Sequence, residues 1–167
     1  NGFIDDFIGW DCSGYSGSFS DSDNNPLPPA GVSNGGTWAH GTHVAGLLSA
    51  TTNNGTGIAS TAFNCSIMCV KVSSGEQDYP YITHGYEGIL YAAKAGFISG
   101  DFTIINNSWG GIGYSQYEQA TINIVHENYN AVVLAAGGNG DEDGQGTDEF
   151  AHFPSSYQNV LSVCPTG

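Results

Sequence analysis

The stretch HGTHVAGLL, which begins at His40, contains a histidine placed to act as a general base. Its apolar residues recur at the three- and four-residue spacing of one helix face, so the pattern predicts a helix from His40 to about Ala50. A histidine in the first turn of a helix meets the positive end of the helix dipole, which disfavours the imidazolium and leaves the ring a neutral base near pH 7. The side chains expected to enter a core are Val44, Leu47 and Leu48.

The segment Ser108-Trp109-Gly110-Gly111 follows a predicted strand over residues 103–107. A serine, an aromatic residue and two glycines at the end of a central strand can present a bare backbone edge. An extended peptide can pair along such an edge as an added strand. The segment is therefore a candidate for binding a peptide backbone, although Gly-Gly turns also end many strands that bind nothing.

The segment AAGGNG, residues 135–140, follows a second predicted strand over residues 131–136. Its small residues leave room for a pocket, into which Asn139 can direct its side-chain amide. Acyl transfer needs such a donor where the oxyanion develops, and removing it commonly costs ~3 kcal/mol of transition-state stabilisation. An Asn beside Gly, like a lone histidine at a helix start, is usually structural. The presence of all three motifs in one chain favours catalysis.

Strands and helices alternate along the remainder of the chain. Alternation of this kind produces right-handed crossovers and a parallel sheet, whose active sites gather at the carboxyl ends of the strands. Composition predicts that the strand over residues 131–136 is buried on both faces. The sequence therefore predicts an α/β fold, with no internal repeat and no linker between domains. Strands are predicted over residues 67–72, 103–107, 131–136 and 159–164. Helices are predicted over residues 82–97 and 117–129.

The balance of charge excludes several classes of partner. The 167 residues include sixteen acidic residues and two lysines, which gives a formal net charge of −14. Binding nucleic acid needs clustered basic side chains, and no apolar run is long enough to span a bilayer. The acidic side chains of a protein with this net charge repel one another unless salt or divalent cations screen them. The composition therefore indicates an extracellular setting that is salty or contains calcium. Because the sequence begins at Asn1 rather than Met, we expect further residues to precede it.

Four cysteines leave two alternatives for disulfide pairing. Cys65 and Cys69 would lie roughly 13 Å apart in a strand, which is too far to bridge each other. Cys12 can pair with one of these two, or the thiols, including Cys164, can be free and buried. No CxxC pair or neighbouring histidine indicates zinc.

Together, the three motifs resemble those of subtilisin-like serine proteases, the subtilases. HGTHVAG resembles the family's histidine motif, NNSWGG its substrate-binding strand, and AAGGNG its oxyanion-asparagine motif, with glycine at position 137 where an alanine is usual. The resemblance covers essentially the whole chain and implies a three-layer subtilisin-like fold, with a mostly parallel central sheet flanked by helices. It implies that His40 is the general base and that Asn139 binds the oxyanion. The implied substrate-binding residues are Ser108, Trp109 and Gly110 for the substrate backbone, and Ala136, Gly137 and Gly138 for the pocket of the residue before the scissile bond.

Two members of the family's Ser-His-Asp triad have no match within residues 1–167. The family's serine belongs to a Gly-Thr-Ser-Met-Ala type of motif beyond the asparagine, and its aspartate to an Asp-Thr/Ser-Gly motif upstream. Asp11 has a spacing to His40 that could suggest the triad aspartate, but the sequence DCSG that begins at Asp11 matches the Asp-Thr/Ser-Gly motif poorly. The segment NGFIDDFIGWD instead resembles the part of the family sequence that follows the triad aspartate. We therefore expect residues 1–167 to be a partial catalytic domain, truncated at both ends and inactive by itself.

The resemblance implies structural calcium, whereas catalysis needs no cofactor. Candidate loops are residues 53–56 and the acidic residues 141–143 with 148–149, and no ligand is assigned to either. Residues 21–25, rich in Asp and Asn, lack EF-hand spacing and predict a solvated loop. The expected setting is extracellular, for a secreted monomer that acts on a protein or peptide substrate without nucleic acid or membrane insertion.

Two other classes of function stay open. A catalytically inactive subtilase-like domain would serve as an extracellular binding module, and the triad motifs of the flanking sequence distinguish it from a protease. A metallohydrolase would use His40 and His43 as ligands. That class is disfavoured because HExxH requires a glutamate directly after the first histidine, where this chain has Gly41.

Overall fold

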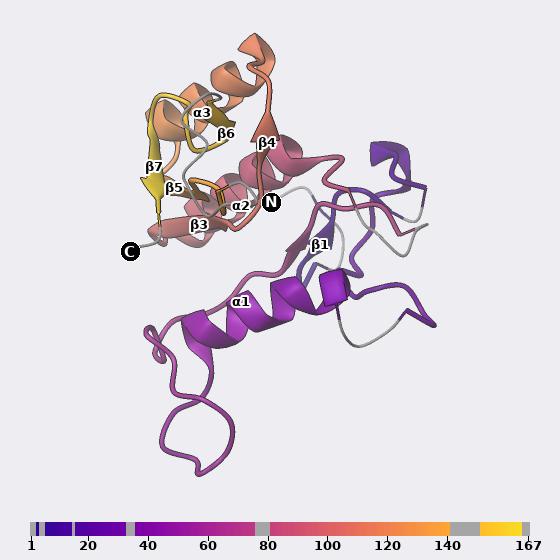
Figure 1. The fold of residues 1–167 in the computed structure, drawn as a ribbon, viewed down its shortest axis with the longest axis vertical. Helices are drawn as coiled ribbons and strands as arrows, with labels where there is room; N and C mark the ends of the chain where they lie inside the picture. The colour runs from indigo at the N-terminus through magenta and orange to yellow at the C-terminus, as the bar shows by residue number, and fades with distance from the viewer. Residues whose placement is uncertain are drawn as a thin grey trace. The chain divides into compact units, whose positions relative to one another are not determined.

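The computed structural model describes residues 3, 6–14, 16–32, 36–75, 81–140 and 151–164. The chain divides into two compact units, Gly2–His84 and Gly85–Gly167. Each unit is described by itself below, and its elements are labelled in Figure 1.

The described residues of the first unit form one α-helix and a pair of very short strands. β1 (Trp10–Asp11) pairs in parallel with β2 (Val70–Lys71). The predicted strand over residues 67–72 is therefore only two residues long. Two 3₁₀ helices, η1 (Phe19–Asp21) and η2 (Gly36–Ala39), precede α1 (His40–Ser49). The helix predicted over residues 40–50 is confirmed in position and length.

The burial of α1 differs from the prediction. None of its ten residues is buried, and Leu47 is 51% exposed. The segment that follows the helix contacts its backbone instead: Thr61 N and Ala62 N donate to the carbonyl oxygens of Leu47 and Leu48 at 3.2 and 2.8 Å. The expectation that Val44, Leu47 and Leu48 enter a core was wrong for the described residues, because Val44 and Leu48 are only half-buried and Leu47 is exposed.

The second unit is a parallel sheet with two helices. The strands β3 (Thr103–Asn107), β5 (Ala131–Ala136) and β7 (Val160–Val163) pair in the order β3-β5-β7, all parallel. The helices α2 (Gly85–Ser99) and α3 (Gln116–Asn128) contact each other and both contact β5 (Figure 1). The predicted α/β fold with a parallel sheet is confirmed.

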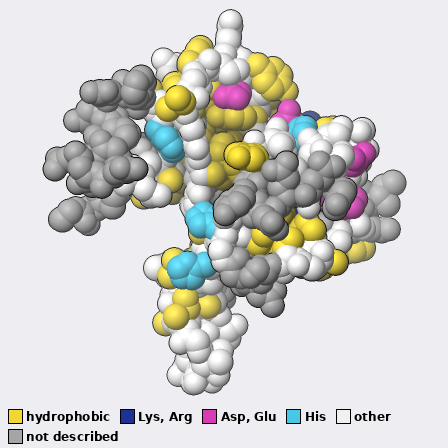
Figure 2. Space-filling view, turned by 45° about the vertical axis from the view of Figure 1, so that its right-hand side comes forward, with side chains coloured by type: hydrophobic (Ala, Val, Ile, Leu, Met, Phe, Trp, Pro, Cys, Tyr) yellow, Lys and Arg dark blue, Asp and Glu magenta, His cyan; other side chains and the backbone are white. Residues whose placement is uncertain are grey.

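The core of the second unit lies between the helices and one face of the sheet. The alternation of buried and exposed residues along β3 marks this face, since Ile105 is 7% exposed and Ile104 is 62% exposed. Along β5 only Val133 and Ala135 are buried. The prediction that β5 is buried on both faces was therefore wrong for the described residues, whose helices cover one face. Figure 2 shows further apolar side chains open to solvent. The fully buried side chains of this core include Ile89, Ile122, Val125 and Val133.

Local sequence signals explain where the helices begin and end. Ser115 caps α3 by accepting from Glu118 N at 3.4 Å, and Glu118 lies in the positively polarised first turn. After α2, Gly100 adopts a φ of +80°, and Asp101 N donates to the carbonyl of Gly96 at 3.1 Å. Gly96 must be glycine, since an added Cβ would lie 1.7 Å from Thr103 Oγ1. This close approach lets the chain turn directly from α2 into β3.

Two further strands, like β1, were not predicted. β4 (Gly111–Ile112) and β6 (His152–Phe153) form an antiparallel pair in which Gly111 lies opposite Phe153, and Ile112 lies opposite His152. A pair this short carries no periodic pattern in the sequence. It joins the segment after β3 to the segment that leads into β7.

Cys12 is buried, whereas Cys65, Cys69 and Cys164 are exposed and form no disulfide. The alternative of a disulfide between Cys12 and Cys65 or Cys69 is therefore not realised, and the expected burial holds for the Cys12 thiol alone. Among the residues that the structure describes, no helix has the length and apolar character needed to cross a bilayer.

Candidate active site

Two neighbouring parallel strands bring the predicted substrate-binding segments to one edge of the sheet. β3 and β5 pair in register, with Asn107 opposite Ala135, so residues 108–110 and 136–138 leave adjacent strand ends. Asn107, which is 4% exposed, fixes this edge by donating from Nδ2 to Leu134 O at 3.0 Å. The structure therefore brings together the six residues predicted for substrate binding: Ser108, Trp109, Gly110, Ala136, Gly137 and Gly138.

The imidazole of His152, in β6, lies against both of these segments. Its Nδ1 is 3.2 Å from Ala136 O, and because a carbonyl oxygen only accepts, Nδ1 is the donor. An added Cβ would lie 2.2 Å from His152 Cε1 at Gly110, and 3.8 Å from His152 Cδ2 at Gly138. Sequence reasoning missed His152, because no motif in the chain distinguishes this histidine from a structural one.

Trp109 is held by an aromatic cluster that sequence reasoning also missed. Its ring meets Tyr86 edge to face, with centroids 5.8 Å apart at 89°, and Tyr86 meets Tyr157 at 5.9 Å. The Tyr157 hydroxyl donates to Glu118 Oε2 at 2.5 Å and accepts from Ser115 N at 2.9 Å. The start of α3 thus anchors the rings behind the predicted peptide-binding edge.

The two phenols of this cluster resist ionisation. Burial raises the pKa of Tyr86 above its usual range, and the negative charge of Glu118 raises it further. Burial also raises the pKa of Tyr157, and its hydrogen bond to Glu118 adds to that effect. Both hydroxyls therefore stay protonated near neutral pH, and the Tyr157 hydroxyl donates to the Glu118 carboxylate.

The predicted base and the predicted oxyanion donor lie in different units. His40 and His43 are both exposed in the first turns of α1, where the N-cap Ala39 supplies no side-chain hydrogen bond. Asn139 is exposed in the turn after β5, between Gly138 and Gly140, which have φ values of +110° and +79°. That His40 and Asn139 open onto one cleft stays a prediction.

Sequence comparison identifies the family. The family model for subtilases, peptidase S8, matches residues 11–167. The chain belongs to the subtilase family. It is 35% identical over 168 residues to an extracellular basic protease of Dichelobacter nodosus, which covers 96% of this chain and 24% of that protein. It is 36% identical over 161 residues to thermitase of Thermoactinomyces vulgaris, which covers 95% of this chain and 47% of that protein.

Other comparisons agree with this family and its fold. The major intracellular serine protease of Bacillus subtilis is 35% identical over 147 residues, covering 87% of this chain and 42% of that protein. The crystal structure of the psychrophilic subtilisin-like protease Apa1 from Pseudoalteromonas sp. AS-11 matches with a TM-score of 0.57 and 28% identity. It covers 91% of this chain and 34% of that one. The subtilase chain therefore spans less than half the length of these relatives.

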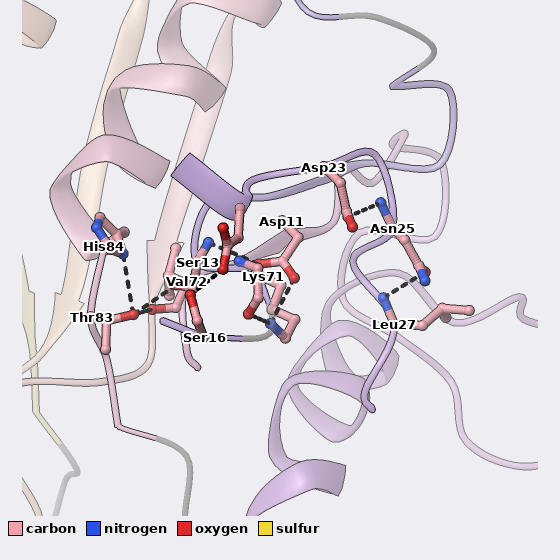
Figure 3. Close-up of polar contacts among 12 residues, drawn as sticks. Asp11, Ser13, Ser16, Asp23, Asn25, Leu27, Lys71, Val72, Thr83 and His84 are labelled. Carbon is pink, nitrogen blue, oxygen red and sulfur yellow. Dashed lines mark hydrogen bonds and ion pairs between the residues drawn. The ribbon is translucent and has the colours of Figure 1, made fainter. Parts of the chain in front are cut away.

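Asp11, the tempting candidate for the triad aspartate of this subtilase, is engaged elsewhere. Its Oδ2 lies 2.7 Å from Lys71 Nζ, and its Oδ1 accepts from the backbone N–H groups of Ser13 and Gly14 at 2.9 and 3.0 Å (Figure 3). These contacts hold the Asp11 carboxylate against Lys71 and the loop that follows β1. That Asp11 is not the triad aspartate stays a prediction.

The described calcium candidates lie in loops whose side-chain oxygens make local hydrogen bonds, and structural calcium stays a prediction. In residues 53–56, Asn54 Oδ1 accepts from Thr56 N at 3.0 Å, and the loop contains no carboxylate. In the loop of residues 21–25, Asp23 Oδ1 likewise accepts a hydrogen bond from Asn25 N at 2.8 Å. Among the described residues, no group of three His, Cys, Asp or Glu side chains could hold a metal ion, which also leaves His40 and His43 without a third ligand. The acidic residues 141–149 lie outside the described part of the chain.

Proposed function

We propose that the protein containing this subtilase chain is a serine endopeptidase that hydrolyses peptide bonds through a Ser-His-Asp triad. The observation that carries the proposal is the register of β3 and β5, which sets residues 108–110 beside residues 136–138 at one sheet edge. The backbone of Ser108, Trp109 and Gly110 would pair with an extended substrate. Ala136, Gly137 and Gly138 would form a wall of the pocket for the side chain before the scissile bond.

In the proposed reaction, His40 takes the proton from the nucleophilic serine as its oxygen attacks the peptide carbonyl. The Asn139 side-chain amide donates to the oxyanion of the tetrahedral intermediate. The protonated His40 then delivers its proton to the leaving amine. Neither the serine nor the aspartate motif of the family has a match in residues 1–167, so we propose that both residues come from outside this segment.

The test compares wild type with a His40→Ala variant of the natural full-length protein on a peptide substrate. Loss of the base should lower kcat by about 10⁴-fold or more, as in other triad enzymes. His126→Ala is the matched control, because His126 is an exposed histidine in the last turn of α3. Equal activity of wild type and His40→Ala, or no hydrolysis of any peptide by wild type, would overturn the proposal.

Residues 1–167 alone are proposed to be inactive, because a base and an oxyanion donor without a nucleophile cannot form an acyl-enzyme. Turnover of a peptide by purified residues 1–167 that survives repurification would refute this.

The second candidate is a catalytically inactive subtilase-like binding module. The exposed, glycine-rich edge at Gly110 and Gly111 favours it, since peptide binding there needs no nucleophile. Saturable binding of an extended peptide by the full-length protein, with no cleavage, would identify this function.

Secretion, a monomeric state and structural calcium are further proposals. The acidic composition supports an extracellular setting, and one relative carries the name extracellular basic protease. Sedimentation of the full-length protein tests the monomer, and detection in the culture medium of its source tests secretion. A melting temperature unchanged by a calcium chelator would refute structural calcium.

A further inference from the structure

The proposed oxyanion donor, Asn139, is followed directly by a glycine. Gly140 has no side chain to keep its backbone nitrogen away from the Asn139 carboxamide, and its φ of +79° is a conformation that glycine adopts without strain. Asn139 is also exposed, so water can reach the carboxamide. In an Asn-Gly sequence the peptide nitrogen can attack the side-chain carbonyl carbon, which is the first step of spontaneous deamidation.

Neither reacting group is held by a hydrogen bond within the part of the chain that the structure describes. The Asn139 carboxamide and the Gly140 N–H make no such bond there. The exposed residue Asn54 offers a contrast, because it also precedes a glycine with positive φ, Gly55 at +69°. Asn54 Oδ1, however, accepts from Thr56 N at 3.0 Å, which restricts rotation of its carboxamide. Asn139 should therefore deamidate faster than Asn54.

We propose that Asn139 is a site of spontaneous deamidation through Gly140, and that this modification inactivates the endopeptidase. The inference rests on the proposed function, in which Asn139 binds the oxyanion. Gly140 N loses its proton to hydroxide and bonds to Asn139 Cγ, and the side-chain nitrogen is protonated and leaves as ammonia. Water then adds to one carbonyl of the succinimide and breaks that carbon's bond to nitrogen, which yields aspartate or isoaspartate at position 139.

Both products remove the function proposed for the Asn139 side chain. Each replaces a hydrogen-bond donor with a carboxylate, which only accepts. The new negative charge also repels the oxyanion that forms beside it. The kcat of the modified protein should therefore fall by about 10²-fold or more, at least the effect of losing the donor alone.

The experiment incubates the full-length protein in mildly alkaline buffer, where hydroxide promotes the reaction. Peptide mass spectrometry measures the deamidated fraction at Asn139 and at Asn54, and the initial rate of peptide hydrolysis measures activity. Asn139 should convert faster than Asn54, and activity should fall in proportion to the unmodified fraction of Asn139. The rate of loss should not depend on protein concentration, which separates deamidation from autolysis between two molecules.

Two matched variants change the glycine that follows each asparagine. Gly140→Asn should slow both the conversion of Asn139 and the loss of activity, measured relative to the variant's own initial rate. The added side chain hinders the attack, and asparagine tolerates a positive φ. Gly55→Asn is the control, at a glycine of similar φ, and should leave the rate of activity loss as in wild type.

Conversion of Asn139 no faster than that of Asn54 would overturn the inference, and this comparison needs only the wild-type protein. Full activity of protein in which Asn139 has been converted would also overturn it. Both results leave the endopeptidase function intact. If freshly purified wild type hydrolyses no peptide, the proposed function fails and the inferred inactivation fails with it.

Discussion

Asp11 Oδ2 and Lys71 Nζ lie 2.7 Å apart, and their side chains are only 7% and 8% exposed. The pair joins β1 to β2 directly, since these two residues are opposite each other in the ladder. Lys71 also donates to Gly14 O at 3.3 Å, so one cation serves both the strand and the loop that follows it. The contact is a buried charge pair with its hydrogen bonds largely satisfied.

Removing the cation should destabilise the first unit. Lys71→Met leaves the Asp11 carboxylate buried without its partner, which typically costs about 3–5 kcal/mol. Unfolding in urea, followed by tryptophan fluorescence, would measure the loss. Lys94→Met is the control, because Lys94 is the only other lysine and lies on α2. A difference of less than about 1 kcal/mol between the two variants would contradict the role assigned to the pair.

Gly137 and Cys164 should behave as a coupled pair. A Cβ added at Gly137 would lie 2.5 Å from Cys164 Sγ and 3.2 Å from Ser162 Oγ. Gly137→Ala should therefore cost about 1–3 kcal/mol through overpacking, and adding Cys164→Ala should recover most of that loss. A double-mutant cycle on urea midpoints measures the coupling, and strictly additive effects would argue against it. This contact explains why glycine stands where subtilases usually carry alanine.

The Tyr86–Tyr157–Glu118 cluster predicts a stability that declines in alkali. The folded-state pKa of both phenols is raised above the ordinary value of 10.0. Above about pH 10 the unfolded chain therefore loses phenolic protons that the folded chain keeps, and stability falls as pH rises. Below that pH the contribution is fully present.

Urea unfolding between about pH 8 and pH 11 tests this prediction. The double variant Tyr86→Phe/Tyr157→Phe should show a shallower alkaline decline than wild type. Tyr117→Phe, at a position that is 67% exposed, should retain the wild-type slope. Parallel curves for wild type and the double variant would show that the cluster does not cause the decline.

Asn139 should act on the rate of the chemical step rather than on substrate binding. In the full-length protein, Asn139→Ala removes the proposed oxyanion donor, and kcat should fall with KM nearly constant. The expected fall is about 10²–10³-fold, the size of the effect when subtilisin, a member of the same family, loses its oxyanion asparagine. Steady-state kinetics measure it, and a variant with wild-type kcat would remove Asn139 from the mechanism.

Regular elements were predictable where a periodic pattern repeats over several residues. The predicted bounds of β3 and β5 agree with the structure, and α1 and α3 begin and end within one residue of prediction. The glycine-rich segments after β3 and β5 were also predicted correctly as neighbours, because parallel strands deliver their carboxyl ends to one edge.

Features that depend on tertiary contacts could not be predicted in this way. β4 and β6 are two residues each, too short for a pattern, and they form only because segments distant in sequence meet. His152 acquires its place through that pairing, so its sequence neighbours give no indication of its position. The burial of α1 was overestimated because an apolar stripe identifies the face that can be covered but not what covers it.

The ion pair of Asp11 and Lys71 also affects how other molecules approach this protein. It withdraws one of the two basic side chains of the sequence into the interior, while sixteen acidic residues set the external field. Acidic peptides should therefore associate with the protein more slowly than basic peptides of equal length. Added salt should reduce this difference in association rate. Discrimination among substrates would then begin during diffusion, before any pocket is reached.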